Sequence, residues 1–151
     1  MSSNNPKLHL YGQNAAVTIE GSSKQTQDGA YYTVNLDVAP KPDDRVDWSR
    51  KISLQLSPQE LVLMCGILLG YAPKAHFQRP GKGIHLERQP DKVFISASAG
   101  QGNRFALPLN IGDTQRAADL LIHQLVRGSF TGSVESVLAG VRGACALLKS
   151  Q

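Results

Sequence analysis

Three short stretches that alternate between apolar and polar residues follow one another in the second half of the chain, separated only by turn residues. They are Ile84–Gln89, Lys92–Ala99 and Arg104–Asn110, joined by Pro90-Asp91 and by Gly100–Asn103. Alternation with a period of two is typical of a half-buried strand. Connections this short do not allow the crossover between parallel strands, which needs roughly a dozen residues. The stretches therefore predict an antiparallel meander.

Other segments with the same alternation precede the meander. Tyr31–Val38 and Lys51–Leu56 each predict a strand, and Leu8–Glu20 predicts one or two short ones. The segments that connect them are polar or rich in proline and glycine, and we interpret them as loops: Gly21–Ala30, Lys41–Arg50 and the long basic stretch Tyr71–Gly83.

Helices are indicated by their end signals. Ser57-Pro58-Gln59-Glu60 is the pattern of a capping box with proline at the first helical position, and the apolar run that follows stops at Gly70. Ile111–Arg127 and Ser133–Lys149 predict two further helices with one apolar side. The order sheet, helix, sheet, helix, helix predicts an α+β fold, with an antiparallel sheet or sheets and helices packed on one face.

A chain of 151 residues has the size of one domain. We expect residues 1–7 to form a disordered tail and residues 8–151 a single α+β domain. No apolar run approaches the ~20 residues that span a bilayer, and the first residues lack a signal-peptide pattern. We therefore expect a cytoplasmic location and no membrane partner. Cys65 and Cys145 lie in apolar helical patterns and are interpreted as small buried hydrophobic residues.

Positive charge is concentrated in one part of the chain. Between Tyr71 and Arg104 there are six Lys and Arg residues and two acidic ones, and this excess of four equals the net charge of +4 of the whole chain. Cations on a polar sheet face can bind phosphates, while aromatic rings stack on bases. The alternative is an ordinary solvated face whose residues pair across strands. The candidate nucleic-acid-binding residues are Tyr31, Lys51, Lys74, Arg79, Lys82, His85, Arg88, Lys92, Phe94 and Arg104.

Residues for catalysis are not visible in the sequence. The four histidines, at positions 9, 76, 85 and 123, have no ligand spacing among themselves or with cysteine. No nucleophile stands in a known motif beside a base, and Pro80-Gly81-Lys82-Gly83 lacks the full pattern of a P-loop. We therefore expect no catalytic residue, no metal site and no cofactor, and predict that the protein is not an enzyme.

A family resemblance adds to this interpretation. Lys51–Gly70 followed by Gly83–Ser98 resembles, in the order of its elements, the Whirly and transcriptional-coactivator superfamily of regulators that bind single-stranded DNA. The nearest counterpart of the Whirly lysine-glycine stretch is Gly81-Lys82-Gly83, and the rest of that motif is missing. The resemblance implies strands bound across the sheet, Lys82, Phe94 and Arg104 among the binding residues, and a homo-oligomer, either a dimer or a tetramer.

The sequence thus favours a non-catalytic nucleic-acid-binding protein, with single-stranded DNA as the preferred partner, acting in transcription regulation, replication or DNA transfer. The alternative is a protein-interaction or assembly module that binds no nucleic acid. In that case the apolar residues of the last two helices form contacts between copies of the chain.

Overall fold

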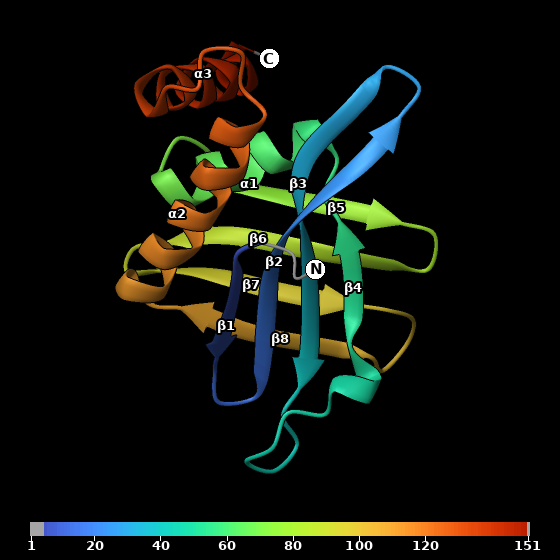
Figure 1. Ribbon diagram of the computed structural model, residues 1–151. Coiled ribbons are helices and arrows are strands. Elements are labelled where there is room, and N and C mark those ends of the chain that lie inside the picture. Colours follow the sequence, from blue (N-terminus) through green and yellow to red (C-terminus); the bar gives the residue numbers. More distant parts are fainter. Residues whose placement is uncertain (1–4, 151) are drawn as a thin grey trace.

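The computed structural model describes residues 5–150, which form two antiparallel sheets of four strands each and three α-helices (Figure 1). The first sheet has the order β1 (Lys7–Tyr11), β2 (Ala15–Thr26), β3 (Gly29–Pro40) and β4 (Ile52–Gln55). The second has the order β5 (Lys74–Arg79), β6 (Lys82–Gln89), β7 (Lys92–Ser98) and β8 (Arg104–Leu109). The helices are α1 (Pro58–Leu69), α2 (Ile111–Arg127) and α3 (Val134–Ala146). The predicted α+β class is confirmed.

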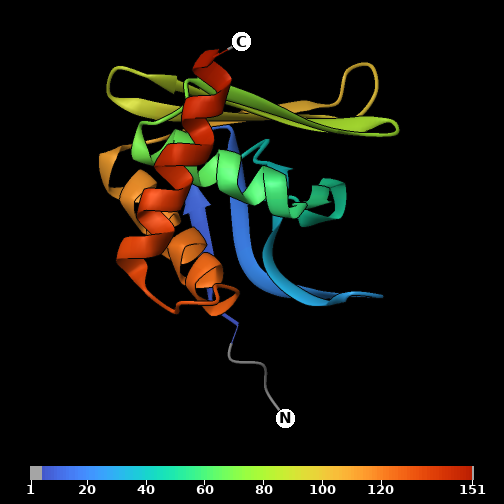
Figure 2. The same cartoon turned by 90° about the horizontal axis from the view of Figure 1, so that it is seen from above.

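The two sheets cross. In Figure 1 the strands of the first sheet run across those of the second, and in Figure 2 the first sheet, α1 and α2 all lie on one side of the second sheet. No helix formed by residues 5–150 covers the other side of β5–β8 (Figure 2). Short 3₁₀ helices at Trp48–Arg50 and Leu147–Ser150 complete the described chain.

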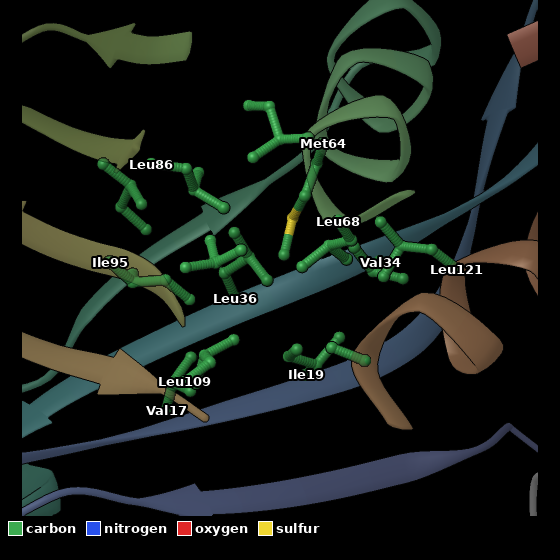
Figure 3. Packing of buried hydrophobic residues seen from close by; sticks show 14 of the residues in the cluster. Val17, Ile19, Val34, Leu36, Met64, Leu68, Leu86, Ile95, Leu109 and Leu121 are labelled. Carbon is green, nitrogen blue, oxygen red and sulfur yellow. The ribbon is translucent and has the colours of Figure 1, made fainter. Parts of the chain in front are cut away.

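The buried side chains form one cluster to which both sheets contribute. Val17, Ile19 and Leu36 come from the first sheet, and Leu86, Ile95 and Leu109 from the second (Figure 3). Met64 and Leu68 of α1 and Leu121 of α2 fill the space between them. The strands β1 and β8 bury every second residue, which is why their period-two pattern is clear in the sequence.

The ends of α1 match the sequence signals. The Ser57 Oγ accepts a hydrogen bond from the Glu60 backbone N–H at 3.2 Å, and Glu60 Oε1 accepts one from the Ser57 N–H at 2.9 Å. Gly70 ends the helix at a φ of 91°, a left-handed conformation that a residue with a Cβ rarely adopts. The predicted capping box and glycine stop are both confirmed.

Two segments interpreted as loops are strands instead. The interpretation of Tyr71–Gly83 as a loop is wrong, because this segment contains β5, which pairs along β6 and turns back at Pro80-Gly81. Gly21–Ala30 is the far half of the β2–β3 hairpin, where Lys24 pairs with Tyr31 in register. This half of the hairpin projects from the body of the molecule in Figure 1. Its outermost residues bury no apolar face, and they therefore carry no period-two hydrophobic signal.

The start of the domain also differs from the prediction. Lys7, expected in a disordered tail, is the first residue of β1 and pairs with Glu20 in register. The carbonyl of Pro6 accepts a hydrogen bond from the Gly21 N–H at 2.8 Å, which ties the chain to β2 before β1 begins. Residues 1–4 of the predicted tail lie outside the described residues.

Neither Cys65 nor Cys145 forms a disulfide, and both are buried, as predicted. Burial raises the pKa of the Cys65 thiol to about 12, and Cys145 adds a smaller contribution in the same direction. Of the helices in the described part of the chain, none combines the length and the apolar character needed to cross a membrane.

Candidate nucleic-acid interface

The side of β5–β8 that faces away from the core is here called the outer face. Because side chains alternate along a strand, Val93, Ile95 and Ala97 point into the core, and Phe94 points outward, as expected from the sequence. Antiparallel pairing brings five of the outward residues into two neighbouring rows: His76 lies opposite His85, which lies opposite Ser96, and Ser98 lies opposite Arg104. The outer face therefore gathers Lys74, His85, Lys92, Phe94 and Arg104 from the predicted set.

A shallow hollow of about 220 Å³ lies on this face. It is lined by His76, His85, Ser96, Ser98 and Arg104, which come from all four strands. The two imidazole rings are 5.8 Å apart between centroids, and each interacts with a neighbour on its own strand. His76 Nε2 lies 2.8 Å from an oxygen of Gln78, and His85 Nε2 lies 3.4 Å from Glu87 Oε1. The hollow thus presents ring edges, hydroxyls and one guanidinium.

The charges of the outer face are mostly positive. Lys74, Lys92 and Arg104 lie on it together with one carboxylate, Glu87. Lys92 Nζ is 3.4 Å from Asp91 at the adjoining turn. Within residues 5–150, neither Lys74 nor Arg104 has an ion-pair or hydrogen-bond partner for its charged group. Two cations are therefore available to an anionic ligand.

A second polar hollow lies where the two sheets approach each other, and we call it the inter-sheet cleft. Its volume is about 370 Å³. The β2–β3 hairpin supplies Lys24 and Tyr31, and β4 and the residues after it supply Ser53, Leu54, Gln55 and Ser57. The turn between β5 and β6 closes it with Arg79, Pro80 and Lys82. Tyr31, Arg79 and Lys82, which were predicted from two separate segments, therefore meet here.

Arg79 holds the cleft together. Its guanidinium donates two hydrogen bonds to the Glu60 carboxylate, at 2.6 and 2.9 Å, and a third to the backbone carbonyl of Gln55 at 2.7 Å. The hydrogen bonds from Arg79 hold the pKa of the Glu60 carboxyl below its ordinary value, although partial burial acts in the opposite direction. Arg79 thus joins the start of α1 to β4 and β5, and its charge is already compensated.

Two predicted residues belong neither to the outer face nor to the inter-sheet cleft. Arg88 points to the side opposite His85, where its guanidinium donates to the Ile67 carbonyl at 2.8 Å. It compensates the carbonyl groups at the end of α1, a position that favours a cation, so the guanidinium lies away from the outer face. Lys51 lies on the first sheet with Nζ 3.7 Å from Asp37.

Sequence reasoning missed two residues that line the hollows. Lys24 was placed in a loop, although it pairs with Tyr31 in register and therefore shares its face. His76 was also placed in a loop, yet the alternation of Ala75 and Phe77 with polar neighbours was the signal that it lies on a strand. Among the described residues, no group of three or more His, Cys, Asp and Glu side chains is arranged to hold a metal ion.

Comparison with known proteins identifies the fold but not a family. No protein-family model matches the chain, and no curated protein sequence matches it. Among solved structures, the chain is similar to one described as crystal structures of Trypanosoma brucei MRP1/MRP2, with a TM-score of 0.63 and 7% sequence identity. The match covers 88% of this chain and 90% of that one. At this identity the likeness shows that the two chains share the same α+β fold.

Proposed function

We propose that this protein is a non-catalytic nucleic-acid-binding protein that takes single strands, DNA in preference, across its outer face. The observation that carries the proposal is the arrangement on β5–β8. The Phe94 ring lies one row away from the hollow that Arg104 lines, on a sheet face without a helix. Rows of outward side chains two residues apart along a strand are separated by about 7 Å.

A sheet face that offers a ring and cations distinguishes single strands from duplexes. A side-chain ring that lies on a sheet reaches the flat face of a base only when that base is unpaired and turned outward. Stacking of this kind contributes on the order of 1–3 kcal/mol per base, and cations add a term that weakens with salt. The outer face offers both kinds of contact, which favours a single strand over a duplex.

The biological role is proposed from the same preference for single strands. We propose a role in transcription regulation, replication or DNA transfer, and a cytoplasmic location. The resemblance to the Whirly superfamily stays a prediction.

The test is fluorescence anisotropy of a labelled oligo-dT strand at two salt concentrations, with duplex DNA as competitor. Phe94→Ala is expected to weaken binding by roughly five- to a hundredfold, because it removes a stacking ring. Arg104→Ala is expected to weaken binding to all sequences alike and to lower the salt slope by about one.

Two further variants serve as controls. Phe94→Tyr keeps a ring and is expected to bind nearly as the parent does, while Arg142→Ala removes an exposed cation of α3 and is expected to change nothing. If Phe94→Ala and Arg104→Ala both bind oligo-dT with the affinity of the parent, the outer face is ruled out as the binding site. If the parent itself binds no strand at low salt, an assembly module becomes the better account of the protein.

We also propose that the protein is a homo-oligomer, a dimer or a tetramer. Phe130 is fully exposed, and Val134 and Leu147 are at least half exposed. Phe130 borders an apolar groove of about 380 Å³, which Val62, Leu125 and Val137 also line. An exposed ring beside an apolar groove suits a two-fold contact, because each copy offers the other both a projection and a recess.

The mass in solution tests this proposal. Light scattering is expected to give a multiple of the 16.3 kDa chain for the parent and a smaller mass for Phe130→Ser. Tyr11→Ser, which also removes an exposed ring but on β1, is the matched control and should leave the mass unchanged. A monomeric parent at high concentration, or a Phe130→Ser variant that stays assembled, would contradict the proposal.

A further inference from the structure

The inter-sheet cleft has a charge pattern that the proposed strand path on the outer face does not use. Of the described residues that line it, three are cations and none is acidic. Glu60 compensates Arg79 from behind the cleft. Lys24 and Lys82 have no ion-pair or hydrogen-bond partner among the described residues. The cleft therefore keeps two uncompensated positive charges.

The two lysines come from different walls. Lys24 belongs to the β2–β3 hairpin and Lys82 to the first residue of β6, just after the turn. The Arg79 hydrogen bonds to Glu60 and to the Gln55 carbonyl hold that turn against β4 and α1. One wall is thus built around a fixed guanidinium. Both lysines line the same hollow, and no carboxylate lines it with them. A ligand group with two negative charges matches the two positive charges of Lys24 and Lys82.

An aromatic ring lies beside the cations. Tyr31 is the cross-strand neighbour of Lys24, so both side chains project from the same face of the hairpin. Ser53 and Gln55 line the cleft from β4 and offer a hydroxyl and an amide. A volume of about 370 Å³ lies within the range of small-molecule sites, which starts at roughly 300 Å³. The cleft has room for one nucleotide and not for a duplex.

We infer that the inter-sheet cleft is a binding site for one nucleoside phosphate that carries a terminal, doubly charged phosphate group. Lys24 and Lys82 bind the phosphate, and Tyr31 stacks on the base. The same chemistry occurs in a free mononucleotide and at the phosphorylated end of a strand. Binding of a free nucleotide is independent of the function proposed above, whereas capture of a strand end rests on it.

The free nucleotide is tested with the full chain by NMR titration with thymidine 5′-monophosphate at low salt, with thymidine as the ligand control. The monophosphate is expected to shift the backbone amides of Lys24, Tyr31 and Lys82, and thymidine is expected to shift them far less. The double variant Lys24→Ala/Lys82→Ala should bind the monophosphate at least about tenfold more weakly, since it loses two charged contacts. Lys7→Ala, which removes an exposed first-sheet lysine outside the cleft, is the matched control and should bind as the parent does.

The strand end is tested by anisotropy with oligo-dT that carries either a phosphate or a hydroxyl at its end. The phosphorylated strand is expected to bind more tightly, and the double lysine variant should abolish that difference while it still binds both strands. The same affinity for both ends, with the monophosphate bound in the cleft, would restrict the site to free nucleotides.

The outcomes separate this inference from the proposed function. If the monophosphate leaves the amides of the cleft unchanged, or binds the double variant as well as the parent, the cleft site is overturned even when oligo-dT binds the outer face. If the monophosphate binds the cleft and no strand binds at all, the proposed function is overturned and the cleft site stands.

Discussion

Replacement of Gly66 with alanine is expected to lower the free energy of unfolding by about 1–3 kcal/mol, because α3 crosses α1 at this residue. A Cβ at Gly66 would overlap the Sγ atom of Cys145, which is buried against α1. Alanine favours a helix by roughly 1 kcal/mol over glycine, so the loss would be larger without that gain. Val141 and Cys145 are the buried residues of α3, and a shift of this helix would expose both. Urea unfolding followed by circular dichroism measures the change.

A second substitution and a matched glycine test the cause. Cys145→Ala removes the overlapping atom, so the double variant Gly66→Ala/Cys145→Ala should recover most of the stability that Gly66→Ala loses. Gly143 lies in α3 with open space around the position of a Cβ, and Gly143→Ala is expected to stabilise the protein by about 0.5–1 kcal/mol. Equal effects of alanine at positions 66 and 143 would contradict the close approach of the two helices.

The parts of the fold that could be predicted are those where burial and local signals agree. The strands β6, β7 and β8 place alternate apolar side chains in the core, such as Ile84, Ile95 and Leu107, so their alternation shows in the sequence. The start of α1 depends on four consecutive residues, Ser57 to Glu60, because the two capping hydrogen bonds join Ser57 to Glu60 within this segment. Such features need no information from distant segments.

The missed parts depend on distant contacts. The outer half of the β2–β3 hairpin is polar on both sides, because it projects beyond the core, and its pairing shows only in the register of Lys24 with Tyr31. The division of the strands into two crossing sheets depends on how α1 and α2 fill the space between them. An alternating pattern indicates that a strand has a buried face but not which sheet it joins.

The same limit applies to the candidate site. Outward residues of the meander, such as Phe94 and Arg104, follow from alternation alone, and the structure places both on the outer face. The roles of Arg79 and Arg88 do not, because their partners are the Glu60 carboxylate and the Ile67 carbonyl on α1. A count of cations along the sequence treats free and compensated charges alike. The structure shows which of them a ligand can use.

A buried glutamine of α2 fixes the hairpin that carries one wall of the inter-sheet cleft. Gln124 is 0% exposed, on the side of the helix that otherwise packs apolar residues. Its Nε2 donates hydrogen bonds to the backbone carbonyls of Thr33 at 2.7 Å and Ser22 at 3.1 Å, one on each strand of the hairpin. Gly21 makes room for this amide, since a Cβ there would lie 2.9 Å from it. The contact lies close along the chain to Lys24 and Tyr31.

Replacement of Gln124 with methionine, which has a similar length but no amide, is therefore expected to lower the free energy of unfolding by about 2–4 kcal/mol, because two largely buried carbonyls lose their donor. Gln115→Met, at an exposed position of the same helix, is the matched control and should change stability by less than about 0.5 kcal/mol. Hydrogen exchange is expected to rise along the hairpin more than in β6 and β7, because the amide joins α2 to β2 and β3 only. Faster exchange shared evenly by both sheets, or a loss of stability as small as that of Gln115→Met, would show that packing rather than these hydrogen bonds holds the hairpin in place.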